Sequence, residues 1–170
     1  MRVLALISIL LCSMSAFSKE YSEELIEADL NNLFKYALNG SASQLDAKRE
    51  VVPFAAVVKN DGHVGFLYLP EDNEDVKKMS LIDQASYLRA QLRKTAKDGE
   101  IRASSVAMYT LMEVKGVKLQ GLSIELEHAA NIALYRFIPV SEDRKEEIIT
   151  IHTENTVSET NIPSVFTDNS

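Results

Sequence analysis

Two β-rich runs that flank Asp61-Gly62 constrain the fold more than any other feature of this sequence. The runs cover 51–59 and 63–69, and Asp-Gly tolerates the positive φ angles of a two-residue type I′ turn. With that turn, one strand face carries Phe54, Ala56, Val58, Leu67 and Leu69, and the other carries Ala55, Val57, Phe66 and Tyr68. Because both faces are apolar, we expect a covered sheet, or one face set aside for a partner.

The rest of the pattern predicts two helices and a meander of strands. Apolar residues at helical spacing predict a first helix from Ser22 to a stop at Asn39-Gly40, and a second from Ser80 to Asp98-Gly99. Further strands are expected over 103–114, 122–127, 132–140 and 148–152. The order α-β-β-α-β-β-β favours an α+β fold, an antiparallel sheet of about five to six strands with both helices on one face. In this order the chain resembles profilin-like and roadblock-like folds, an analogy that implies no activity.

The N-terminal residues 1–18 have the order of a cleaved signal peptide. Arg2 precedes the apolar run Val3–Leu11, and the small residues Ala16 and Ser18 precede the predicted cleavage site. The run is shorter than the ~20 residues that cross a bilayer, so we expect no stable membrane insertion after cleavage. The sequence therefore predicts a periplasmic or secreted protein, with a single α+β domain over 19–152 and a polar, loosely ordered C-terminal tail over 153–170.

Composition excludes several classes of function. The single cysteine, Cys12, would leave with the signal peptide, so the mature chain has neither a disulfide nor a thiolate metal site. The chain has 18 Lys and Arg against 25 Asp and Glu, a formal charge of −7. This balance argues against a nucleic acid partner and favours a basic protein partner. No glycine-rich phosphate loop is present, so no cofactor is expected.

Four residues are the candidates for metal or acid–base chemistry. Glu125, Glu127 and His128 crowd one strand end, and His152 supplies another imidazole. Glu125 and Glu127 share the strand face on which carboxylates normally meet water, and no His-x-x-x-His pattern occurs. We therefore expect no metal. No serine lies in a nucleophile elbow, so catalytic residues stay unassigned and an enzyme is the less favoured interpretation.

Three motifs resemble a group of small uncharacterised bacterial exported proteins. They are Pro53-Phe54-Ala55-Ala56-Val57 before Asp61-Gly62, Gly99-Glu100-Ile101-Arg102-Ala103, and Ile124-Glu125-Leu126-Glu127-His128. The resemblance covers about half of the mature chain and implies the same element order. It also implies a bacterial cell-envelope setting and no particular activity.

Together these features predict an exported, non-catalytic binding protein, of the kind that immunity and inhibitor proteins represent. Val57, Phe66 and Tyr68 are the predicted partner-binding residues, because they form the second apolar face of the hairpin. One alternative is a small envelope enzyme or metal-binding protein that uses Glu125, Glu127 and His128. A second alternative is a structural homodimer through the hairpin face, which predicts that Phe66 and Tyr68 are exposed in the isolated chain.

Overall fold

The computed structural model describes residues 21–46, 51–70, 72–143 and 148–166, and the predicted signal peptide lies outside them. The elements, in chain order, are α1 (Glu23–Asp46), β1 (Phe54–Lys59), β2 (Val64–Leu67), α2 (Glu74–Lys77), α3 (Leu81–Lys97), β3 (Ile101–Val114), β4 (Val117–His128), β5 (Ile132–Asp143), β6 (Ile148–Ile151), a 3-10 turn η1 (Thr153–Asn155) and β7 (Val157–Thr160). The predicted α+β class is confirmed. No helix in the described ranges is long and apolar enough to cross a membrane.

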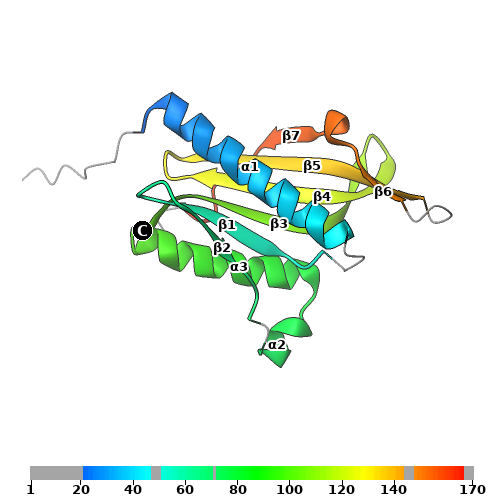
Figure 1. Ribbon diagram of the computed structural model, residues 1–170, viewed down its shortest axis with the longest axis horizontal. Coiled ribbons are helices and arrows are strands. Elements are labelled where there is room, and N and C mark those ends of the chain that lie inside the picture. Colours follow the sequence, from blue (N-terminus) through cyan, green and yellow to red (C-terminus); the bar gives the residue numbers. More distant parts are fainter. Residues whose placement is uncertain (1–20, 47–50, 71, 144–147, 167–170) are drawn as a thin grey trace, which may run out of the picture.

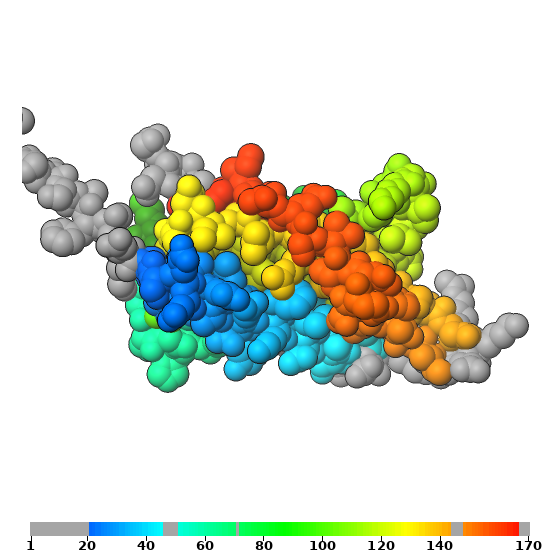
Figure 2. Space-filling view, turned by 90° about the horizontal axis from the view of Figure 1, so that it is seen from above, coloured from blue at the N-terminus to red at the C-terminus, as the bar shows by residue number. Residues whose placement is uncertain are grey.

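Within the described residues, all strand pairs are antiparallel, and the sheet has seven strands (Figure 1). The strand order is β2-β1-β3-β4-β5-β6, and β7 pairs with a different stretch of β5. The long β3–β4 hairpin closes at Lys115 and Gly116, which have φ angles of 52° and 81°, as a type I′ turn requires. Figure 2 shows α1, blue to cyan, along one side of the molecule, with the orange segment around β6 and η1 beside it.

The two main helices cover opposite faces of the sheet. On one face, Leu33 of α1 packs in a buried cluster with Phe54 and Val58 of β1. On the other face, Leu88 of α3 packs in a second cluster with Val57. We expected both helices on one face. The structure differs because β1 is apolar on both sides, and each side has to be buried against a helix.

Helix α1 continues beyond the predicted stop at Asn39-Gly40. Its last turns bury Ser41 and place Leu45, which is 9% exposed, in the core. A Cβ added to Gly40 would lie 2.6 Å from Cζ of Phe54. Gly40 thus lets the helix backbone approach the Phe54 ring, and this tertiary contact outweighs the weak helix propensity of glycine.

The β1–β2 hairpin closes with a longer loop than the predicted two-residue turn. Ala56 pairs with Phe66, and the N–H of Lys59 donates to the carbonyl of His63 at 2.9 Å. The loop between Lys59 and His63 therefore has one residue more than predicted. Gly62 has a φ of +89°, which fits a type I turn followed by a G1 bulge.

This one-residue shift moves side chains to the other face of β2. Phe66 and Tyr68 lie on the face of Phe54, whereas Leu67 packs with the cluster of Val57 on the α3 face. The predicted grouping of Val57 with Phe66 and Tyr68 is therefore wrong. The apolar pattern of β1 does not oppose the shift, because this strand presents apolar residues on both faces.

The C-terminal tail packs against the domain up to residue 166, although the sequence predicted a loosely ordered tail from residue 153. Strand β7 pairs with Leu134–Phe137 of β5. Beyond it, Val165 is 4% exposed and belongs to the α3-side cluster. The polar composition of this segment does not indicate its anchoring, which combines the main-chain pairing of β7 with the burial of Val165.

Candidate functional site

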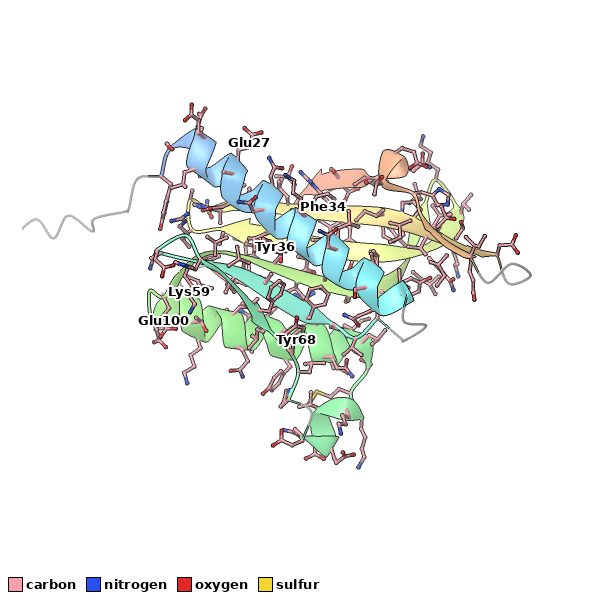
Figure 3. All side chains as sticks on the ribbon, in the orientation of Figure 1. Glu27, Phe34, Tyr36, Lys59, Tyr68 and Glu100 are labelled. Atoms are coloured by element: carbon pink, nitrogen blue, oxygen red, sulfur yellow. The ribbon has the colours of Figure 1, made fainter. Side chains whose placement is uncertain are left out.

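Three exposed aromatic rings form a continuous surface on the α1 face, beside β2. Tyr36, Phe66 and Tyr68 are 44%, 44% and 63% exposed, and we call them the aromatic surface. The Phe66 ring lies 5.7 Å from Tyr36 in a T-shaped arrangement and 6.1 Å from Tyr68 in a stacked one. Phe54, which is 2% exposed, stacks against Tyr68 from below. Figure 3 labels Tyr36 on α1 and Tyr68 just beyond β2.

Strand β2 is also an edge of the sheet. Antiparallel residues alternate between pairs that exchange hydrogen bonds and pairs whose N–H and C=O groups point away from each other. His63 bonds to β1, so Gly65 does the same, and the main-chain groups of Val64 and Phe66 point outward. No other strand lies beside β2 in the part of the chain that the structure describes. Phe66 therefore contributes both to the open edge and to the aromatic surface.

The three predicted partner-binding residues are separated. Phe66 and Tyr68 belong to the aromatic surface, whereas Val57 is 9% exposed and packs beneath α3. Sequence reasoning missed Tyr36, because this residue comes from α1 and only the folded chain places it beside the hairpin. Asn32 and Asn39 lie on the same side of the helix as Tyr36 by their spacing, and their polarity indicates that this side of an amphipathic helix is exposed.

A buried ionic cluster lies on the same face of the sheet, at the N-terminal end of α1. Asp29, 4% exposed, accepts hydrogen bonds from Nε and Nη2 of Arg102 at 2.7 and 3.0 Å. This bidentate pairing raises the pKa of Arg102. Nε2 of the fully buried His128 lies 3.4 Å from Oδ2 of Asp29, outside hydrogen-bond geometry. The Tyr21 ring packs edge-on against His128 with centroids 4.7 Å apart.

The His128 ring is held in its neutral form. Its Nδ1 accepts a hydrogen bond from the N–H of Ala130 at 3.0 Å, so the neutral ring carries its proton on Nε2. Burial lowers the pKa of His128, and the carboxylate of Asp29 offsets only part of this effect. The cluster is therefore a satisfied internal ion pair beside a neutral imidazole.

We predict that His128 makes the protein less stable below about pH 6.5, the ordinary pKa of histidine. Because folding lowers this pKa, the unfolded chain binds the proton first, and the free energy of unfolding falls as the pH decreases. The slope is at most about 1.4 kcal/mol per pH unit and levels off below the folded-state pKa. The free energy of unfolding should be measured with denaturant between pH 7.5 and 5, in ~0.5-unit steps. We expect it to depend less steeply on pH in His128→Gln than in the wild type. Equal slopes in both proteins would contradict this assignment.

The structure does not bring the candidate metal residues together. Glu125 and Glu127 lie on the α3 face, whereas His128 lies on the α1 face. Glu125 accepts hydrogen bonds from Nε and Nη2 of Arg89 at 2.7 and 2.6 Å. The described residues contain no group of His, Cys, Asp and Glu side chains that could hold a metal ion. Glu125 instead ties Arg89 of α3 to strand β4.

The remaining candidate, His152, belongs to a different site at the junction of β5 and β6. Its Nε2 lies 2.8 Å from Oγ of Ser141, and its Nδ1 lies 3.2 Å from Oε1 of Glu154. The backbone N–H of Glu154 and the His152 ring lower the pKa of the Glu154 carboxyl. Ser141, His152 and Glu154 thus line up as hydroxyl, imidazole and carboxylate, the order of a nucleophile, a base and an orienting acid. Sequence reasoning missed Ser141, because no local motif marks it.

Comparisons of the chain with protein-family models, curated proteins and solved structures find no match.

Proposed function

We propose that this chain is an exported, non-catalytic protein-binding domain, immunity-like or inhibitor-like, that binds an extended, net-basic segment of a partner protein along β2. The observation that carries the proposal is the coincidence of an open strand edge with the aromatic surface at Phe66. An added strand would satisfy the outward main-chain groups of β2, and its side chains would contact the exposed rings.

Aromatic residues suit this role because they contribute a large contact area at a low cost in side-chain entropy. Tyr36, Phe66 and Tyr68 are pre-positioned by their mutual ring contacts and by the buried Phe54 beneath Tyr68. A partner strand would therefore meet a surface that is already formed. Less conformational entropy is then lost on binding.

Charge supports a basic partner rather than a second copy. The chain has a formal charge of −7, so two copies repel each other, whereas a basic segment is attracted at long range. Strand β2 itself, Val64–Leu67, contains no charged residue. The central strand pairing would thus be governed by main-chain bonds and aromatic contacts, and the net negative charge of the chain would favour the approach of a basic segment.

The direct test is a fluorescence anisotropy titration with a labelled octapeptide of alternating Lys and Val, at about 0.15 M salt. We expect binding that weakens at least about tenfold in Phe66→Thr and in Tyr68→Ser, the loss typical of an aromatic hot spot. Leu111→Thr is the matched control, because Leu111 is 65% exposed on the distant part of β3. It should bind as the wild type does.

Two control peptides separate strand addition from charge attraction. Alternating Glu and Val should bind weakly, and a Lys-Val peptide with two central prolines should fail, because proline cannot donate to a sheet ladder. Equal affinity for the proline peptide, or equal affinity of Phe66→Thr and wild type, would overturn the proposal. So would a doubled mass of the free protein that Phe66→Thr abolishes, since a second copy would then occupy the edge.

The Ser141–His152–Glu154 arrangement favours a second candidate function, hydrolysis of activated esters. Oγ of Ser141 would attack the acyl carbon while His152 takes its proton and passes it to the leaving alcohol, and water would then release the acid. This candidate predicts that a fluorophosphonate probe labels Ser141 in the wild type. Labelling should be lost in both Ser141→Ala and His152→Gln, and equal labelling of His152→Gln would contradict it.

A further inference from the structure

The chain holds its own C-terminal segment, residues 161–166, against the α3 face through contacts that recognise a peptide main chain. The buried carboxylate of Glu127 accepts hydrogen bonds from the N–H groups of Ser164 and Val165 at 2.8 and 2.7 Å. Its second oxygen accepts a bond from the Ser164 hydroxyl at 2.8 Å. From the other side, Nε of Arg93 donates to the carbonyl of Ser164 at 2.7 Å.

The buried carboxylate of Glu127 depends on this segment for its hydrogen-bond donors. The residue is only 4% exposed, and a buried carboxylate is costly unless donors surround it. The hydrogen bonds to its carboxylate from described residues all come from Ser164 and Val165. Residues 164–166 form a bend, which lets two consecutive N–H groups reach one carboxylate oxygen. Glu127 and Arg93 therefore act as a complementary pair that binds the N–H and C=O groups of one bent peptide segment.

The side chains of the segment add selectivity. Val165, 4% exposed, lies in the cluster formed by Leu88 and Leu92 of α3. Phe166 packs against the same cluster. The contacts thus fit a hydroxyl residue followed by a β-branched apolar residue and an aromatic one.

We propose that Glu127, Arg93 and the apolar side of α3 form a peptide-binding site, and that the C-terminal segment is its ligand held in cis. The external ligand is a peptide of another protein with a Ser-Val-aromatic sequence, bound in the same bent conformation. This site is independent of the function proposed above, because it lies on the α3 face and the aromatic surface lies on the α1 face.

A tethered ligand competes strongly with a free one. The short connection from β7 keeps the segment at an effective concentration of about millimolar or more. An external peptide therefore binds the wild-type chain weakly, because only the small fraction of molecules with a released segment can accept it. Weakening the cis segment should expose the site without altering Glu127 or Arg93.

The test uses the full chain with Val165→Asp, which places a charge in the apolar cluster, and a labelled peptide of residues 160–166. We expect one peptide per chain, with an affinity at least about tenfold higher than for the wild type. Ser164→Pro is a second releasing variant, because it removes an N–H donor to Glu127. Circular dichroism and the unfolding midpoint confirm that each variant is folded.

Adding Glu127→Gln to either releasing variant is the decisive control. The amide keeps the size of the side chain but loses the charge and half of its acceptor capacity. We expect peptide binding to fall at least about tenfold, and a peptide with Val165→Asp to bind no variant. No binding to either folded releasing variant, or binding that Glu127→Gln leaves unchanged, would overturn the proposal.

Discussion

Asp29→Ala is expected to lower the free energy of unfolding by about 3–5 kcal/mol, the typical cost of removing one partner of a buried ion pair. The Arg102 side chain is 12% exposed, and both oxygens of Asp29 accept its hydrogen bonds. Without the carboxylate, the guanidinium keeps its charge in a site that excludes most water, with a carbonyl bond to Asn60 as a remaining contact. Urea unfolding followed by circular dichroism measures this loss.

The double variant Asp29→Ala/Arg102→Ala is the matched control. It removes both charges, so the penalty for an unpaired guanidinium disappears. We expect the double variant to lose less stability than the sum of the two single variants, by at least about 1 kcal/mol. Additive losses would show that the ion pair is not energetically coupled.

Phe54→Ala is expected to cost about 3–5 kcal/mol, as large-to-small substitutions of buried aromatic residues do. The ring is 2% exposed, packs against Gly40 of α1 and supports Tyr68 of the aromatic surface. The substitution leaves a cavity between α1 and β1. Thermal and urea unfolding should both report the loss, and a cost below about 1 kcal/mol would contradict this packing.

Gly40→Ala tests the same contact, because the contact determines whether the substitution raises or lowers the free energy of unfolding. In a helix interior, alanine normally stabilises by about 0.5–1 kcal/mol relative to glycine. In the wild type, however, the new Cβ would lie 2.6 Å from Cζ of Phe54, so we expect a loss of stability. In the Phe54→Ala background the methyl group has room, and the same change should stabilise. The same sign in both backgrounds would show that Gly40 and Phe54 are not in contact.

Local sequence signals predicted the elements but not the register of the first hairpin. Asp61-Gly62 fits a two-residue turn and also the end of a longer G1-bulge loop, because glycine accepts positive φ in both. Hydrophobic alternation usually selects between such registers. Here it does not, because Ala55, Ala56 and Val57 are apolar on both faces of the strand. For the same reason the sequence did not reveal that α1 and α3 lie on opposite faces.

The contacts that define the sites connect residues far apart in sequence. Asp29 and Arg102 are separated by 73 positions, and Glu127 and Ser164 by 37. One sequence contains no local pattern for such pairs, so Glu127 was predicted to face water. Phe66 and Tyr68 could be predicted from the sequence as partner-binding residues, because large apolar side chains are normally buried in the core or at an interface. Tyr36 required the three-dimensional structure.

The most direct test of the proposed binding edge is amide hydrogen exchange, measured by NMR with and without a saturating concentration of the Lys-Val peptide. We expect the amides of Val64 and Phe66 to exchange at least about tenfold more slowly in the complex. The amide of Gly65, which already bonds to β1, should change little. Unchanged exchange at Val64 and Phe66 in the presence of bound peptide would contradict the proposal that this edge is the binding site.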